Sequence, residues 1–295
     1  MNLQGCGTAL VTPFQPDGSL DGPALRSLVA RQIDGGISVL IPCGTTGEAA
    51  TLSEQETLRV VEITVEVAAG RVPVFAGCTH NATAVAVANA KKLAQLPGLT
   101  GILTANPYYN RPSQEGQFQH FRAIAEATPL PVMLYNIPGR TASNLLPETA
   151  LRLAEIPNIV AIKESSGVMG QITELLAHAP ATFKVFAGDD ALALPVIALG
   201  GVGVISVASN AVPGPLSQMV AAALANDWPT ARRINARHFA FVLALFTEPS
   251  PAPIKAVLAL LGQCSETLRL PMTPVTEAMR SKLKHLLHGL ELVEE

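Results

Sequence analysis

Residues 159–163 read Ile159-Val160-Ala161-Ile162-Lys163, a short apolar run that ends in a charged side chain. A β-branched run of this length, bounded by turn residues, is typical of a buried strand. Similar runs bounded by Gly or Pro recur along the chain, with helical patterns between them. The predicted strands cover residues 6–11, 38–42, 72–76, 101–104, 132–136, 159–163, 184–187 and 202–207.

The order of these elements predicts an α/β fold. Strands that alternate strictly with helices must pair in parallel, because each crossover returns the chain to the same end of the sheet. Eight such units favour closure into a (β/α)8 TIM barrel over an open doubly wound sheet. After residue 207 the pattern becomes purely helical, over residues 214–225, 229–246, 253–261 and 275–290. We therefore expect a barrel carrying the active site in residues 1–225 and a C-terminal helical appendage in residues 226–295.

Several helix starts are indicated by capping residues. Asp21 and Ser113 each precede an amphipathic run, and Ser53 with Glu56 forms the pattern of a capping box. Asp189 is expected to cap the helix that follows it up to residue 199, rather than to form an acid pair with its neighbour.

The composition excludes several classes of protein. The chain of 295 residues is 48% hydrophobic and 15% charged, which fits a compact globule and not a disordered protein. A net charge of −3 without a basic stripe argues against nucleic acid as a partner. The start, Met1-Asn2-Leu3-Gln4-Gly5, lacks the parts of a signal peptide, and no apolar stretch is long enough to span a membrane, so we expect a cytoplasmic protein. The cysteines lack CxxC spacing and are expected to be buried free thiols: Cys6, Cys43, Cys78 and Cys264.

One lysine stands at a predicted strand end. In this fold the active site lies at the carboxyl ends of the strands, and only Lys163 ends an apolar strand there. Partial loss of hydration would favour its neutral amine, which is a nucleophile toward a carbonyl carbon. The iminium formed with a 2-oxo acid then acts as an electron sink for C–C bond chemistry. The alternative is a structural lysine paired with Glu164 or another nearby carboxylate.

Two other strand ends carry suitable groups. The loop 44–47, Gly-Thr-Thr-Gly, offers hydroxyls and backbone N–H groups that would hold a carboxylate, although an ordinary βα turn can have the same sequence. Tyr135 ends the strand beside the lysine strand, where its hydroxyl could transfer protons; its alternative is packing beside Pro138. Tyr108 and Tyr109, the other tyrosines of the sequence, fall at the same rim.

Five stretches together resemble the dihydrodipicolinate synthase (4-hydroxy-tetrahydrodipicolinate synthase) family, within the superfamily of N-acetylneuraminate lyase and the pyruvate-dependent class I aldolases. They are residues 44–48 (GTTGE), 107–116 (PYYNRPSQEG), 135–141 (YNIPGRT), 162–164 (IKE) and 268–274 (LRLPMTP). The resemblance covers nearly the whole chain.

The resemblance implies a reaction and a set of site residues. The reaction is condensation of pyruvate with L-aspartate 4-semialdehyde to 4-hydroxy-tetrahydrodipicolinate, the committed step of diaminopimelate and lysine biosynthesis, without a cofactor or metal. Lys163 would be the Schiff-base lysine and Tyr135 the general acid/base. Thr46 would link Tyr135 to Tyr109 in a proton relay, with Tyr109 reaching into a neighbouring subunit. The implied substrate-binding residues are Thr45 and Thr46 for the pyruvate carboxylate, Arg140 for the semialdehyde carboxylate, and Gly188 and Ile205, whose backbone carbonyls would line the pocket.

The resemblance also implies a homo-oligomer, usually a tetramer built as a dimer of dimers. Two alternatives remain. N-acetylneuraminate lyases and 2-keto-3-deoxy-sugar-acid aldolases share the lysine, the tyrosine and pyruvate, but they often lack Arg140 and the tyrosine pair. A catalytically silent barrel that only binds pyruvate is the remote alternative. Since both features of the synthases are present here, the sequence favours the synthase.

One departure from the family concerns feedback inhibition. Members inhibited by lysine place two histidines and an acidic residue around a pocket at the dimer interface. Here Glu54 and Thr57 align with the histidines and Val85 aligns with the acid, while Asn81 and Tyr108 remain. Because the carboxylate that would pair with the ammonium of lysine is missing, we expect weak or absent inhibition by L-lysine.

Overall fold

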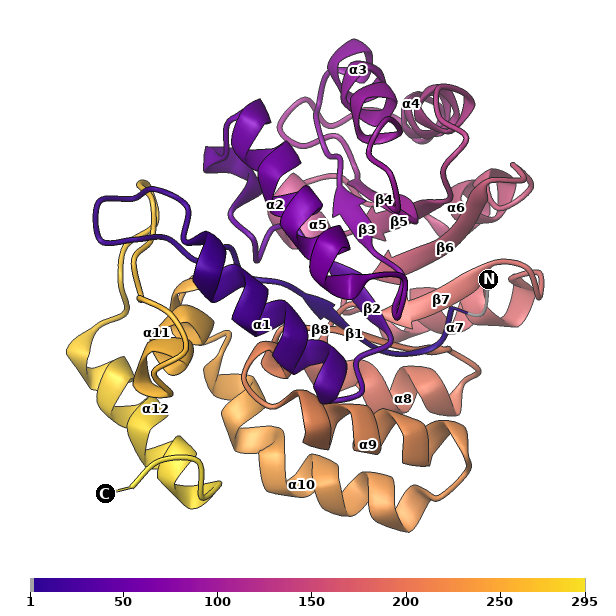
Figure 1. The fold of residues 1–295 in the computed structure, drawn as a ribbon. Helices are drawn as coiled ribbons and strands as arrows, with labels where there is room; N and C mark the ends of the chain where they lie inside the picture. The colour runs from indigo at the N-terminus through magenta and orange to yellow at the C-terminus, as the bar shows by residue number, and fades with distance from the viewer. Residues whose placement is uncertain (1–2, 295) are drawn as a thin grey trace.

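The computed structural model describes residues 3–294 and contains eight strands that alternate with helices (Figure 1). Met1 and Asn2, on which the expected lack of a signal peptide partly rests, lie outside the described residues. The strands are β1 (Gly5–Ala9), β2 (Val39–Ile41), β3 (Phe75–Gly77), β4 (Gly101–Ala105), β5 (Val132–Asn136), β6 (Ile159–Glu164), β7 (Lys184–Ala187) and β8 (Gly203–Ser206). Every predicted strand is present.

The start of β3 was predicted wrongly. The expected strand began at residue 72, whereas β3 begins at Phe75. Pro73 has no N–H to donate to a neighbouring strand, so a regular ladder cannot begin before it. Val74 makes only an isolated bridge with Leu40. The apolar character of residues 72–74 therefore serves packing rather than regular pairing.

The strands form a parallel barrel. Their hydrogen-bonded order is β2-β1-β8-β7-β6-β5-β4-β3, and the two end strands meet at the seam. There the Leu40 N–H donates to the Pro73 carbonyl at 3.0 Å, and the Gly77 N–H donates to the Pro42 carbonyl at 2.9 Å. The predicted (β/α)8 TIM barrel with a C-terminal helical part is confirmed.

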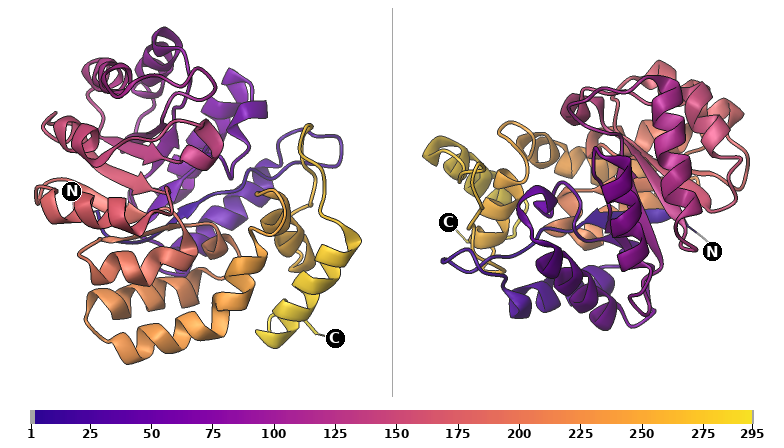
Figure 2. Two further views of the ribbon diagram at one scale, coloured as in Figure 1. Left: turned by 180° about the vertical axis from the view of Figure 1, so that it is seen from behind. Right: turned by 90° about the horizontal axis from the view of Figure 1, so that it is seen from above.

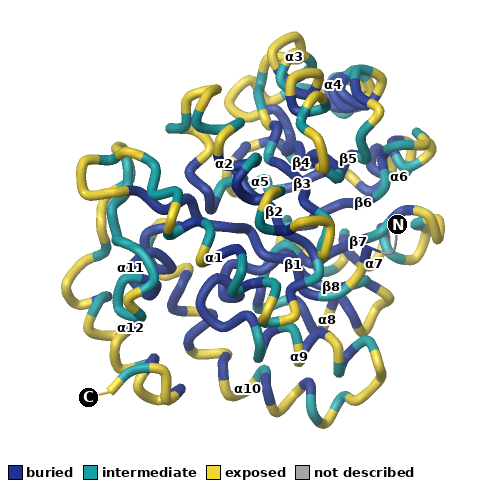
Figure 3. Tube along the Cα trace, viewed as in Figure 1, coloured by how far each residue is buried: buried dark blue, intermediate teal, exposed yellow. Residues whose placement is uncertain are grey.

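Alternate residues of each strand face the barrel interior. The interior cluster includes Val39, Ile41, Phe75, Leu103, Met133, Tyr135, Ala161, Phe186 and Ile205. The residues between them face outward, into a second cluster shared with the helices. Figure 3 shows the strands as largely buried stretches of the chain. Along β6 this alternation turns Ala161 inward and Ile162 outward. Lys163 therefore faces the interior and Glu164 faces the helices.

Helices surround the barrel (Figure 2). They are α1 (Gly22–Asp34), α2 (Glu54–Ala68), α3 (Thr83–Leu93), α4 (Gln114–Glu126), α5 (Pro138–Thr141), α6 (Pro147–Leu153), α7 (Met169–His178), α8 (Ala193–Ala198) and α9 (Pro213–Leu224), with single 3-10 turns at Ala49–Thr51, Asp190–Leu192 and Ala208–Asn210. Asp21 and Ser113 cap α1 and α4 as predicted. Ser53 and Glu56 form the predicted capping box of α2.

The predicted cap at Asp189 is placed differently. Its carboxylate accepts from the Ala191 N–H at 2.9 Å and so caps the 3-10 turn Asp190–Leu192, not a continuous helix to residue 199. Pro195 has no N–H to donate to the carbonyl of residue 191, so an α-helix cannot run unbroken from that point. The chain makes a tight turn first and then enters α8.

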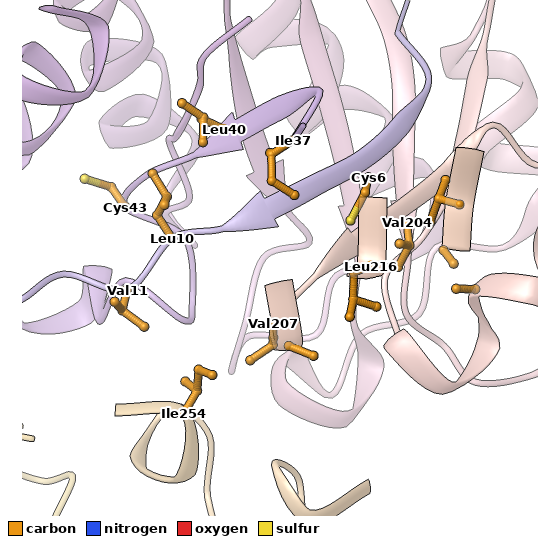
Figure 4. Packing of buried hydrophobic residues seen from close by; sticks show 14 of the residues in the cluster. Cys6, Leu10, Val11, Ile37, Leu40, Cys43, Val204, Val207, Leu216 and Ile254 are labelled. Atoms are coloured by element: carbon orange, nitrogen blue, oxygen red, sulfur yellow. The ribbon is translucent and has the colours of Figure 1, made fainter. Parts of the chain in front are cut away.

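The C-terminal region holds three more helices, α10 (Trp228–Ala244), α11 (Ala252–Leu260) and α12 (Glu277–Gly289). α10 lies beside α9 on the outside of the barrel (Figure 1). α11 joins the core: Ile254 belongs to the same buried cluster as Val11 and Val207, and Figure 4 shows it on the side of α11 that faces them. Within residues 3–294, no helix combines the length and the apolar character needed to cross a membrane.

Candidate active site

A cavity of about 650 Å³ opens at the carboxyl ends of the strands. Three predicted site residues line it: Thr45 after β2, Tyr135 in β5 and Arg140 in α5. Four C-terminal residues that were not predicted also line it: Ser250, Pro251, Pro271 and Met272. The C-terminal region thus supplies part of the cavity wall.

Lys163 is buried, with 4% of its surface exposed, and it is not among the residues that line the cavity; its neighbour Tyr135 is. In the parallel register of β6 it stands opposite Tyr135 of β5 and Phe186 of β7. Its Nζ lies 4.3 Å from the centroid of the Tyr135 ring. The face of an aromatic ring attracts a cation electrostatically, so this contact holds the lysine head beside the tyrosine. The register of two strands brings the predicted nucleophile and the predicted proton-transfer residue together.

The alternative in which Lys163 pairs with Glu164 is wrong. Glu164 points to the helix side of β6, where its carboxylate accepts from Asn136 Nδ2 at 3.0 Å and from the Ser166 N–H at 2.7 Å. Burial raises the pKa of the Glu164 carboxyl, while these hydrogen bonds act in the opposite direction. The two adjacent side chains lie on opposite faces of the sheet: Lys163 contacts Tyr135, and Glu164 holds Asn136 and the Ser166 N–H.

Gly188 and Ile205 both lie close to the interior part of the site. A Cβ added at Gly188 would stand 1.8 Å from Ser165 Oγ and 2.9 Å from Lys163 Cγ, so only glycine fits beside the lysine stem. Ile205 is fully buried in β8, in the same interior cluster as Tyr135. Ser165, which was not predicted as a site residue, has a buried hydroxyl without a hydrogen-bond partner among residues 3–294.

The loop from Gly44 to Glu48 is wound tightly. The Gly47 N–H donates to the Gly44 carbonyl and the Glu48 N–H to the Thr45 carbonyl, both at 3.1 Å. Cys43, which immediately precedes the loop, and Glu48, its last residue, have φ values of 56° and 54°. For residues other than glycine this left-handed conformation costs roughly 1–2 kcal/mol each, so contacts elsewhere must hold the loop in place. Thr45 is half-buried at the cavity, and Thr46 is buried behind it.

Tyr109 does not join the other predicted residues within one chain. Its side chain is 88% exposed, and its backbone adopts a φ of 74°. Tyr108, not Tyr109, lines the cavity. The predicted relay from Tyr135 through Thr46 to Tyr109 is therefore incomplete in a single chain, and the exposed ring is free to contact another molecule.

Arg140 extends along the cavity wall from the one-turn helix α5. Its Nη2 donates to the Ser250 carbonyl at 3.0 Å, across 110 positions of sequence. Among residues 3–294 the guanidinium makes no other hydrogen bond, so four of its five donors are left for other acceptors. A forked, permanently charged side chain in this position suits a carboxylate ligand.

Lys255 was predicted only to lie among the C-terminal helices, but the structure buries it completely against Glu48. One signal in the sequence could have found it. Lys255 lies in an otherwise apolar stretch of α11, and a charge in such a stretch needs a partner. That partner ends the Gly44–Glu48 loop.

The residues aligned with the lysine pocket of inhibited relatives do not provide a free carboxylate. Glu54 is paired with Lys92 at 2.6 Å, and Val85 is an exposed apolar side chain. Asn81 Nδ2 donates to the Tyr108 carbonyl. We expect L-lysine at micromolar concentrations to leave turnover essentially unchanged. Initial rates across a lysine titration test this, and clear half-inhibition in the micromolar range would disprove it.

Among residues 3–294 no group of three or more His, Cys, Asp or Glu side chains is arranged to hold a metal ion. The four cysteines are free thiols as predicted, and Cys6, Cys43 and Cys78 are buried as expected, whereas Cys264 is only half-buried. Burial raises the pKa of Cys43 to about 12, so this thiol beside the cavity stays protonated.

A family model, curated relatives and solved structures all point to the same family of proteins. The model of the dihydrodipicolinate synthetase family matches residues 2–290. A 4-hydroxy-tetrahydrodipicolinate synthase of Acidobacterium capsulatum is 57% identical, over 100% of this chain and 98% of the relative. The crystal structure of dihydrodipicolinate synthase from Aquifex aeolicus superposes with a TM-score of 0.95 at 40% identity, covering 98% of this chain and 99% of the other. A structure described as the first monomeric dihydrodipicolinate synthase variant superposes with a TM-score of 0.96 at 38% identity, covering 99% and 98%.

Proposed function

We propose, from the premise that this chain belongs to the dihydrodipicolinate synthetase family, that Lys163 is its Schiff-base residue. The chain is a lyase, a 4-hydroxy-tetrahydrodipicolinate synthase, which condenses pyruvate with L-aspartate 4-semialdehyde in diaminopimelate and lysine biosynthesis. The observation that carries the assignment is the position of Lys163 Nζ, buried in the barrel 4.3 Å from the Tyr135 ring centroid. Members of the family work without a cofactor.

The proposed chemistry begins with attack of the Lys163 amine on C2 of pyruvate. The resulting carbinolamine loses water to give an iminium, which withdraws electrons from C3 so that a C3 proton can leave. The enamine carbon then attacks the aldehyde carbon of the semialdehyde, forming the new C–C bond. The amino group of the semialdehyde displaces the lysine and closes the ring, which frees Lys163. One water is released overall.

Tyr135 is proposed to carry the protons for these steps. Its ring contacts the lysine head and the residue also lines the cavity, which places Tyr135 next to the proposed reacting carbons. A positioned acid/base group of this kind contributes about 10²- to 10⁴-fold to a rate. Thr46 would pass the proton between Tyr135 and the Tyr109 hydroxyl.

The two substrate carboxylates are proposed to bind at separate places. The Gly44–Glu48 loop presents hydroxyls and backbone N–H groups near Thr45 and Thr46 to the pyruvate carboxylate. Arg140, farther out along the cavity, would hold the semialdehyde carboxylate with its forked guanidinium. Gly188 and Ile205 would supply backbone carbonyls to the inner part of the pocket.

The quaternary structure and location are also proposals. The exposed ring of Tyr109 suits donation to a second chain, which calls for at least a dimer and fits a tetramer built as a dimer of dimers. A biosynthetic enzyme acting on small metabolites fits the cytoplasm. The division into a barrel of residues 1–225 and a helical region of residues 226–295 stays a prediction.

A coupled assay tests the proposed function. Purified protein, pyruvate and aspartate semialdehyde are combined with dihydrodipicolinate reductase. Oxidation of the reduced nicotinamide cofactor of the reductase is then followed. Turnover is expected with this pair and not with sialic acid or 2-keto-3-deoxygluconate. Cleavage of either sugar acid at a comparable rate would favour the sister lyases instead.

The role of Arg140 leads to a separate prediction. Arg140→Ala removes a charged hydrogen-bond donor set worth about 1.5–3 kcal/mol, which corresponds to about 10- to 100-fold. We expect KM for aspartate semialdehyde to rise by that factor, while the pyruvate concentration that half-saturates borohydride trapping stays unchanged. Arg122→Ala, on the outer face of α4, is the matched control. Equal losses for both substrates would contradict the assignment.

A further inference from the structure

A buried ion pair lies just outside the residues assigned to catalysis. Lys255 Nζ in α11 donates to Glu48 Oε1 at 2.6 Å, and the two side chains are 0% and 2% exposed. The same ammonium donates to the Thr267 carbonyl at 2.6 Å, and the Arg269 N–H donates to Glu48 Oε2 at 3.1 Å. Both carboxylate oxygens of Glu48 are therefore bound by the C-terminal region.

Glu48 is also the last residue of the loop that presents Thr45 and Thr46. The Glu48 backbone is left-handed, and its N–H donates a hydrogen bond to the Thr45 carbonyl. The position of the Glu48 Cα is therefore coupled directly to the turn. From the other side, Thr12 Oγ1 donates to the Gly47 carbonyl at 2.7 Å. Since the loop is strained at both ends, its conformation depends on these anchors. The Glu48 carboxylate is the anchor that connects the loop to the C-terminal region, through Lys255 and Arg269.

The C-terminal side of the pair is itself fixed. The Phe14 ring has Lys255 Nζ and Arg269 Cζ each 4.3 Å from its centroid. Arg269 also donates to the Gly18 carbonyl and, at 2.9 Å, to Glu56 of the α2 capping box. Displacement of α11 would therefore be resisted by contacts at several points, and Glu48 is bonded to a rigid support.

A general contribution to stability does not explain this arrangement well. Burying an ion pair costs desolvation that its attraction only partly repays, and apolar replacements of similar volume are often as stable. An apolar pair cannot fix the direction of the Glu48 side chain, whereas here two donors, Lys255 Nζ and the Arg269 N–H, hold its two carboxylate oxygens. The pair directs the Glu48 side chain, and through it the turn that carries the two threonines.

We propose that Lys255 is a positioning residue for the pyruvate-binding loop, acting through its buried ion pair with Glu48. The C-terminal helix α11 thereby determines how well the Thr45–Thr46 turn receives the pyruvate carboxylate, although Lys255 touches no substrate. The proposal rests on the function assigned above to that turn.

Three variants of the full chain test the proposal. Lys255→Met keeps the stem and removes the charge. Because it leaves Glu48 as an unpaired buried charge, this variant can lose stability for a reason unrelated to the loop. The double variant Lys255→Met/Glu48→Gln removes both charges and keeps an acceptor for the Arg269 N–H. Arg237→Met, which breaks an exposed ion pair with Glu291 in the same region, is the control.

The main readout is the pyruvate concentration that half-saturates borohydride trapping, measured below the melting temperature of each variant. We expect it to rise about 10- to 100-fold in Lys255→Met and in the double variant, since misplacing a binding group by about 1 Å has effects of this size. KM for aspartate semialdehyde should change less than about twofold in both variants. The Arg237→Met control should match the wild type.

The outcomes separate this proposal from the one it rests on. If the wild type traps no pyruvate, the proposed function fails. If the wild type traps pyruvate and the double variant has the same half-saturation, the pair does not position the loop, and the inference is overturned. The inference is supported if the melting temperature of the double variant returns toward that of the wild type while its pyruvate affinity stays low. Should Lys255→Met fail to fold, the double variant decides alone.

Discussion

Replacement of Lys163 by alanine is expected to lower kcat by at least about 10³-fold in the coupled assay, a loss of more than about 4 kcal/mol of transition-state stabilisation. In the proposed mechanism no iminium forms without this amine, because Lys92, the lysine that lines the cavity, is paired with Glu54 at 2.6 Å. The variant should lose activity and not stability. The lysine head contacts the neutral Tyr135 ring, so its removal leaves no charged partner buried and unpaired.

Lys184→Ala is the matched control for this change. Lys184 stands in the neighbouring strand β7, but at its opposite end, where its Nζ donates to the Ala181 carbonyl at 2.7 Å. Its loss should leave kcat within about twofold of the wild type, as for most surface changes. Residual activity of Lys163→Ala above about a tenth of the wild type would show that another group forms the covalent intermediate.

Tyr135→Phe is expected to lower kcat by about 10²- to 10⁴-fold. The substitution removes only the hydroxyl, so the ring beneath the Lys163 head and the interior packing persist. We expect pyruvate still to be trapped by borohydride, but with slower formation of the adduct, because loss of water from the carbinolamine needs a proton donor. Stopped-flow or quenched trapping at several times separates the rate of adduct formation from its final amount.

Tyr108→Phe provides the comparison for this result. Tyr108 lines the outer part of the same cavity and is 38% exposed, but no step is assigned to it. Its hydroxyl should be dispensable for kcat. An equal loss in Tyr108→Phe and Tyr135→Phe would show that the effect reflects the cavity wall in general and not proton transfer by Tyr135.

The fold and much of the site could be predicted from local features. Apolar runs between helical patterns located the strands, and their ends located Thr45, Tyr135 and Lys163 at one rim. The error at the start of β3 came from reading Val72 by its propensity while overlooking that Pro73 cannot donate to the ladder. Side-chain alternation would also have excluded the Lys163–Glu164 pair, since neighbours in a strand face opposite sides.

Contacts between distant parts of the sequence were the ones missed. Lys255 and Glu48 are separated by 207 positions, and Arg140 and Ser250 by 110. No periodicity or spacing links such residues, because their proximity results from how the C-terminal helices close over the rim of the barrel. One lysine in an otherwise apolar helix indicates only that its charge has a partner somewhere in the protein. Its identity requires the tertiary structure.

Peptide mapping after borohydride reduction in the presence of pyruvate is the most direct test of the Schiff base. One reduced pyruvate per chain is predicted, on the peptide that contains Lys163, and no adduct when pyruvate is omitted. An adduct on a different lysine, or an unmodified chain at saturating pyruvate, would contradict the assignment of Lys163.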